Sequence, residues 1–112
     1  MDPDHARELL AKERTRIEQA LVRLRHQDDA GEEADEYDPA NTASDLYQDE
    51  LDEGRRDDLM EQLAAVERAE KRLDAGTYGL SIESGDPIPD ERLEAFPTAE
   101  RTADEERRLP RR

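Results

Sequence analysis

Apolar side chains recur near the start of the chain in a helical pattern. Within residues 2–27 they fall on one face at spacings of seven, four and three residues: Leu10, Ile17, Leu21 and Leu24. This spacing is typical of a single apolar stripe on an otherwise charged α-helix. Asp2 suits the N-cap and Pro3 the first helical position. We therefore predict a helix from about Asp2 to Gln27.

The pattern stops between residues 28 and 41. This run contains Gly31, Pro39 and seven acidic residues, and Tyr37 is its only large apolar side chain. Glycine, proline and clustered acids are typical of a connection between helices. We predict an acidic tip at about residues 28–43.

A second stripe follows the predicted tip. Its apolar residues are spaced by four, three and seven: Leu59, Leu63, Val66 and Leu73. Asn41 or Thr42 can cap this helix, and Gly76 is a natural stop after Ala75. Two long helices with one stripe each should pair antiparallel as a coiled coil. The alternative is that the stripes pair between molecules.

The last third of the chain changes character. Tyr78, Leu80 and Ile82 alternate with other residues, and a turn signal follows at 84–87, so we predict a short hairpin. One short helix should begin at 89–91 and end before Phe96, and another should span 102–109. We expect five apolar residues to form a small core: Leu80, Ile82, Ile88, Leu93 and Phe96.

These patterns predict a mainly α fold. Residues 1–76 should form a long antiparallel helical hairpin, and residues 77–112 a small C-terminal subdomain. The composition agrees with a thin apolar seam, because only 33% of the residues are hydrophobic and four are aromatic.

The net charge of −15 favours a basic partner surface and disfavours direct binding of nucleic acid or an anionic membrane. An equally simple reading is that the acids only keep the chain soluble. Solubility is also the simplest interpretation of the basic tail, which contains Arg107, Arg108, Arg111 and Arg112.

Several kinds of site are disfavoured by the residues present. There is no cysteine, and His5 and His26 are isolated, so neither a disulfide nor a thiolate zinc site can form. Carboxylate pairs occur everywhere among 32 acids, and there is no phosphate loop or catalytic triad. We expect no enzymatic activity and no cofactor. The N-terminus lacks the features of a signal peptide and no apolar run could span a membrane, so we expect a cytoplasmic location.

The C-terminal third carries a more specific string, Arg92-Leu93-Glu94-Ala95-Phe96-Pro97-Thr98-Ala99, which follows Tyr78-Gly79 and the Ser84-Gly85 turn. This arrangement resembles the DksA/TraR family over about residues 38–108. Members of that family insert the tip of a helical hairpin into the secondary channel of bacterial RNA polymerase. They alter transcription initiation there, some together with the alarmone ppGpp. The resemblance implies the same partner for this chain.

The chain departs from the family at its zinc site. The four family cysteines fall on Ser81, Ser84, Thr102 and Glu105. Hydroxyls and one carboxylate are poor zinc ligands, so we expect a zinc-finger-like subdomain without zinc. Residues 102–105 instead have the capping-box pattern Thr-x-x-Glu. These positions should therefore begin the last helix.

The resemblance also implies a functional tip. The family motif D-x-x-D-x-A aligns with residues 38–43, so the candidate partner-binding residues are Asp38, Asn41, Thr42 and Ala43. Asn41 stands where the family has a second acid, and an amide lacks its charge. Asn41 and Thr42 have the alternative role of helix caps.

The ppGpp-contacting basic positions of the family fall on Ala65, Phe96 and Glu106. A pyrophosphate needs paired cations, so we expect no ppGpp response at this surface. Two functions follow as hypotheses. The first is a polymerase-binding transcription regulator. The second is a diverged acidic coiled-coil protein with another basic partner and no control of polymerase.

Overall fold

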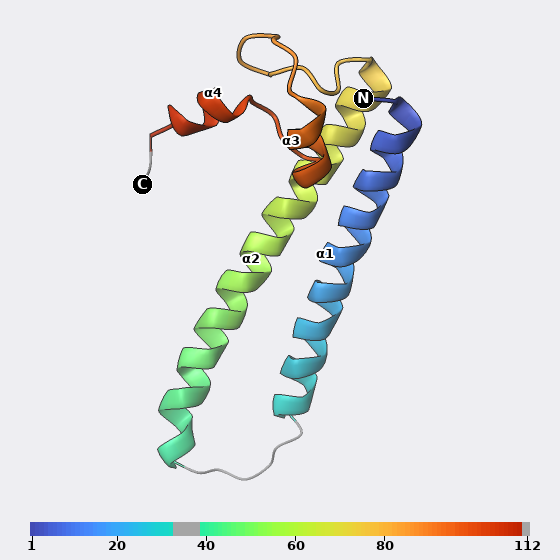
Figure 1. The fold of residues 1–112 in the computed structure, drawn as a ribbon. Coiled ribbons are helices and arrows are strands. Elements are labelled where there is room, and N and C mark those ends of the chain that lie inside the picture. The colour runs from blue at the N-terminus through green and yellow to red at the C-terminus, as the bar shows by residue number, and fades with distance from the viewer. Residues whose placement is uncertain (33–38, 111–112) are drawn as a thin grey trace. The chain divides into compact units, whose positions relative to one another are not determined.

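The computed structural model describes the backbone of residues 1–32 and 39–110, and the side chains of residues 1–26 and 50–110. The described part is mainly helical, as predicted, and its helices are α1 (Pro3–Glu32), α2 (Pro39–Ala75), α3 (Asp90–Ala95) and α4 (Ala103–Arg107) (Figure 1). None of these helices combines the length and apolarity that a membrane span needs.

The chain divides into two compact units. Met1–Arg14 packs with Ala64–Arg112 to form what we call the terminal unit, and Thr15–Leu63 forms the middle unit. Helices α1 and α2 each contribute to both. These units are groups of residues that pack together, and their bounds differ from the domain boundary predicted at residue 76. That domain boundary stays a prediction.

Helices α1 and α2 pair antiparallel inside each unit. In the terminal unit, Arg7 lies 4.0 Å from Asp74, and Arg14 donates to Glu70 at 2.5 Å. In the middle unit, Arg16 Nη2 donates to Gln62 Oε1 at 2.7 Å. Residue numbers that rise on one helix therefore fall on the other, which confirms the predicted pairing within one chain.

Four of the buried apolar residues belong to the predicted stripes: Leu10, Ile17, Leu24 and Val66. In the terminal unit the buried apolar residues come from both long helices and from the C-terminal third: Ala6, Leu10, Val66, Ala69, Ile88 and Leu93. In the middle unit, Ile17 and Leu24 are buried, and Leu59 and Leu63 are partly buried. Asp52 is also buried, seven residues before Leu59, and forms an ion pair with Arg55 at 3.9 Å. Fully burying one such Leu or Ile side chain contributes about 1.5–3 kcal/mol.

Of three helix boundaries in the first half of the chain, one agrees with its prediction and two differ from it. Helix α1 does begin at Pro3, and the Asp2 carbonyl accepts a bond from the Ala6 amide at 3.0 Å. It continues five residues beyond the predicted end at Gln27 and includes Gly31, because acidic residues and a single glycine weaken a helix without breaking it as proline would. Helix α2 begins at Pro39, before Asn41 and Thr42. Neither of those residues is its N-cap, which corrects the capping role considered for them, and proline suits a first helical position.

The end of α2 was predicted correctly. Gly76 has φ 77°, the left-handed conformation that favours glycine. Its amide donates to the Leu73 carbonyl at 3.2 Å, and the Thr77 amide donates to the Arg72 carbonyl at 2.9 Å. These two bonds form a Schellman motif, which satisfies carbonyls left free by the helix end.

The segment after α2 reverses direction where the short hairpin was predicted, and two backbone bonds cross it: the Ser81 amide donates to the Asp86 carbonyl at 2.8 Å and the Ile88 amide to the Gly79 carbonyl at 2.7 Å. Among the described residues its only β-pairing is an isolated bridge between Leu80 and Pro87. Gly79 and Gly85 have φ of 86° and 78°, so the chain turns where a strand would run straight. The predicted small core is wrong in three of its members, since Leu80, Ile82 and Phe96 are exposed. Only Ile88 and Leu93 are buried.

The short C-terminal helices agree with their predictions. Helix α3 spans Asp90–Ala95 and ends before Phe96. Helix α4 spans Ala103–Arg107, and Thr102 is its N-cap in a complete capping box with Glu105. It ends two residues before the predicted Leu109.

Candidate functional site

Most of the predicted tip cannot be described at the level of side chains. Asp38 lies outside the described residues. Asn41, Thr42 and Ala43 lie in the first turns of α2, and only their backbone is described. Their role in binding a partner stays a prediction.

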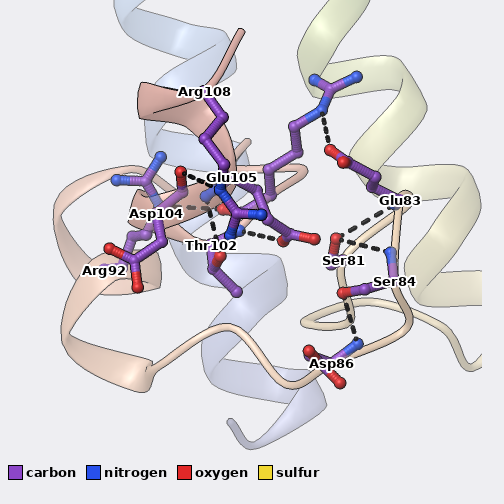
Figure 2. A network of polar contacts seen from close by, with 10 residues as sticks. Ser81, Glu83, Ser84, Asp86, Arg92, Thr102, Asp104, Glu105 and Arg108 are labelled. Atoms are coloured by element: carbon purple, nitrogen blue, oxygen red, sulfur yellow. Dashed lines mark hydrogen bonds and ion pairs between the residues drawn. The ribbon is translucent and has the colours of Figure 1, made fainter.

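The four zinc-like positions do come together in the terminal unit. Ser81 and Ser84 lie on the turn that follows α2, and Thr102 and Glu105 lie at the start of α4 (Figure 2). Ser81 and Glu105 are buried, with 5% and 6% of their surface exposed. Such burial is unusual for polar side chains unless hydrogen bonds satisfy them.

Hydrogen bonds satisfy this cluster from several directions. Ser81 Oγ accepts from the Glu83 amide at 3.1 Å and from the Ser84 amide at 3.3 Å. Glu105 Oε1 accepts from the Thr102 amide at 2.9 Å, and the Glu105 amide donates to Thr102 Oγ1 at 3.3 Å. We call Ser81, Ser84, Thr102 and Glu105 the carboxylate knot.

The Glu105 carboxylate is held in its charged form. The Thr102 amide, which donates to Glu105 Oε1 at 2.9 Å, is the main cause, and the nearby hydroxyls of Ser81, Ser84 and Thr102 act in the same direction. Together these donors outweigh the desolvation that burial brings and lower the pKa of Glu105 to about 2. A carboxylate with several donors is a stable anionic centre at neutral pH.

Further contacts hold the turn against the segment before α4. The Ile82 amide donates to the Glu100 carbonyl at 2.9 Å, and Arg101 Nε lies 3.4 Å from a Glu83 carboxylate oxygen. Tyr78 Oη donates to the Pro97 carbonyl at 2.7 Å, and burial raises the pKa of this phenol. The knot is therefore one part of a wider polar interface within the terminal unit.

A groove also lies in the terminal unit, with a volume of about 490 Å³. The three positions that the resemblance assigns to ppGpp contact all line it: Ala65, Phe96 and Glu106. Its other lining residues are Arg92, Thr98, Ala99, Glu100 and Arg101. Three positions that are far apart in sequence thus meet at one site, although none of them carries a cation.

The charges of the groove are largely balanced within the chain. Glu100 binds Arg68 at 3.1 Å and Arg72 at 3.0 Å. The guanidinium of Arg92 lies 5.6 Å from the centre of the Phe96 ring, in a cation–π contact. The sequence reasoning missed this pair, although a spacing of four residues across the end of a helix is a recognisable signal.

No protein-family model matches the chain. The solved structure of transcription factor DksA2 from Pseudomonas aeruginosa is similar, with a TM-score of 0.74 and 29% sequence identity. The match covers 95% of this chain and 81% of that one. The uncharacterized protein YteA of Bacillus subtilis (strain 168) is 43% identical over 61 residues. That alignment covers 54% of this chain and 26% of YteA, so the chain matches about a quarter of the length of that relative.

Proposed function

Because the chain has a DksA/TraR-like fold without the zinc cysteines, we propose that it is a transcription regulator that binds bacterial RNA polymerase. The observation that carries this proposal is the match to transcription factor DksA2 over 95% of the chain. The convergence of Ala65, Phe96 and Glu106 in one groove supports it independently. Those positions were aligned by sequence alone, and a wrong alignment would not be expected to bring them together.

The proposed point of entry is the tip, residues 28–43. In this proposal the tip enters the secondary channel of the polymerase, and the terminal unit contacts its rim. Asp38 supplies the acidic group, while Asn41 offers only hydrogen bonds where the family has a second acid. A basic channel wall would attract a chain of net charge −15. Contacts made by the tip would then determine the position of the bound chain in the channel.

We propose that this regulation does not depend on ppGpp. The groove presents an alanine, a phenylalanine and a glutamate at the positions that need cations, and Arg101 is already paired with Glu83. Arg92 is a remaining cation, but its guanidinium lies against the Phe96 ring. A pyrophosphate would also meet Glu106, a negative charge at the groove itself.

The alternative is an acidic interaction protein that keeps the scaffold and binds another basic partner. The observation that favours it is Asn41, which removes a charge from the tip motif. In both cases the chain acts by binding in the cytoplasm and not as an enzyme, which fits the regulatory role of the similar transcription factor.

A pull-down of purified bacterial RNA polymerase at moderate salt tests the proposal. The test variant is Asp38→Ala/Ala43→Asp, which exchanges the two residues and leaves composition and net charge unchanged. The control is Glu67→Ala/Ala11→Glu, a similar exchange between two exposed helix positions of the terminal unit.

We expect the wild type and the control to retain polymerase and the tip variant to lose it, with equal helix content by circular dichroism. Equal binding by all three, abolished gradually by salt, would favour the acidic-face alternative. Absence of binding by the wild type would contradict the proposed function.

A further inference from the structure

The carboxylate knot occupies the positions where the family places its zinc ligands, yet its chemistry is different. In a structural zinc site a cation lies at the centre and four ligands, usually thiolates or imidazoles, surround it. Here three of the four positions carry hydroxyls, which are neutral. Only Glu105 carries a charge, and that charge is negative.

The described residues do not fit a resident zinc ion. Ser81 Oγ already accepts two backbone amides, at 3.1 and 3.3 Å, and Ser84 Oγ accepts the Asp86 amide at 3.2 Å. Both hydroxyl groups also help to lower the pKa of Glu105. A zinc ion would have to displace these bonds and would find one carboxylate as its only anionic ligand. No group of three or more His, Cys, Asp or Glu side chains that could hold a metal occurs in the described part of the chain.

The knot brings together two segments that are distant in sequence. The hydroxyls of Ser81 and Ser84 come from the turn after α2, and Thr102 comes from the N-terminus of α4. Figure 2 shows the Glu105 carboxylate pointing toward Ser81, and all three hydroxyl groups lower the pKa of this one carboxylate. The carboxylate is therefore the group on which the turn and the N-terminus of α4 converge.

We infer that the Glu105 carboxylate is the centre of a metal-free cross-link that replaces the zinc of the family fold with its charges reversed. One former ligand position supplies the anion, and the other three positions supply hydrogen-bond donors to it. A cross-link of this kind needs neither a metal nor a thiol. It should therefore resist chelators and thiol oxidants, which remove the metal or the ligands of a zinc–cysteine site.

The first test compares Glu105→Gln with Glu106→Gln in the full chain. Both variants remove one negative charge from neighbouring positions of α4, but Glu106 is exposed and lies outside the knot. The amide introduced by Glu105→Gln would turn one acceptor into a donor that faces other donors. We expect Glu105→Gln to lower the Tm and to speed amide exchange at Thr102 and in the turn at 81–86, while Glu106→Gln melts as the wild type does. Equal Tm values for Glu105→Gln and the wild type would overturn the inference.

A second variant keeps the test decisive if Glu105→Gln does not fold. The quadruple substitution Ser81→Cys/Ser84→Cys/Thr102→Cys/Glu105→Cys should bind one zinc ion per chain and gain Tm on zinc addition, because the four positions converge. Zinc or a chelator should leave the Tm of the wild type unchanged. Failure of the quadruple variant to bind zinc would contradict the convergence. A chelator-induced loss of Tm in the wild type, restored by zinc, would show a resident metal instead.

Discussion

The middle unit and the C-terminal part of the terminal unit bury side chains to a similar extent by different means. In the middle unit, Ile17 and Leu24 are 0% and 6% exposed and lie on an apolar stripe. In the C-terminal part, Ser81 and Glu105 are 5% and 6% exposed and are polar. The first pair needs only apolar neighbours, whereas the second needs a specific donor or acceptor in every direction.

This difference has consequences for how each region fails. An apolar seam loses stability in proportion to the surface and volume removed, and it is indifferent to pH. A hydrogen-bonded carboxylate is lost as a unit when one partner or its charge is removed. Perturbations that act on only one of these two mechanisms should therefore separate the regions.

The largest effect is expected in the seam. Replacing Ile17 by Ala removes a side chain that is 0% exposed and leaves a cavity, so it should lower the free energy of unfolding by about 2–5 kcal/mol. Urea unfolding followed by circular dichroism measures this change. Val22→Ala is the control, because Val22 is 52% exposed and should cost about 0.5 kcal/mol or less. Equal losses of unfolding free energy in the two variants would show that the buried apolar residues do not stabilise the middle unit.

Acid should act next, and on the knot. The pKa of Glu105 is about 2 in the folded chain and near its ordinary value of 4.5 in the unfolded chain. The unfolded state therefore binds the proton first as the pH falls, and the stabilisation by Glu105 is complete above pH 4.5 and disappears toward pH 2. The difference in unfolding free energy between the wild type and Glu105→Gln should shrink over this range. A difference that stays constant across it would contradict the anionic centre.

Smaller changes in stability, of opposite sign, are expected when the glycine inside α2 and the glycine at its C-terminal end are each replaced by alanine. Gly76 has φ 77°, so Gly76→Ala should destabilise the chain by about 1 kcal/mol even though its Cβ would meet nothing within 4 Å. Gly54 lies inside α2 with the same open surroundings, so Gly54→Ala should stabilise it by about 0.5–1 kcal/mol. Thermal unfolding of both variants checks the pair. Shifts of the same sign would be inconsistent with the observed helix end.

The smallest effect is expected at the surface of α4. Arg107 forms an ion pair with Asp104 at 2.5 Å, but both side chains are more than 70% exposed. Arg107→Ala should therefore change the free energy of unfolding by about 0.5 kcal/mol or less. A larger loss in chemical denaturation would mean that α4 depends on this pair as well as on the knot.

The long helices could be predicted from sequence because periodicity and caps are local signals. The stripe through Leu10, Ile17 and Leu24 identified the buried face of α1, and Gly76 identified the end of α2. The end of α1 was missed because acidic residues disfavour the C-terminus of a helix without forbidding it. The capping box at Thr102 was also readable, since its two partners lie three residues apart.

The turn after α2 was harder to predict, since alternation of residue types indicates a strand only if the backbone stays extended. Gly79 and Gly85 bend the chain, and Ile82 is consequently left exposed while Ser81 is buried. The carboxylate knot depends on contacts between residues about twenty positions apart. Only the family resemblance indicated that those positions belong together, and the residue types alone suggested no more than a lost metal site.

The most direct test of a metal-free, DksA-like regulator is a polymerase-binding titration in the presence of a strong chelator. The wild type, Glu105→Gln and Asp38→Ala/Ala43→Asp would be titrated against purified bacterial RNA polymerase under identical conditions. We predict saturable binding by the wild type that the chelator does not weaken, and loss of binding by the tip variant. Binding by Glu105→Gln should fall only where its terminal unit has unfolded. Failure of the wild type to bind, or loss of its binding on chelation, would contradict the account.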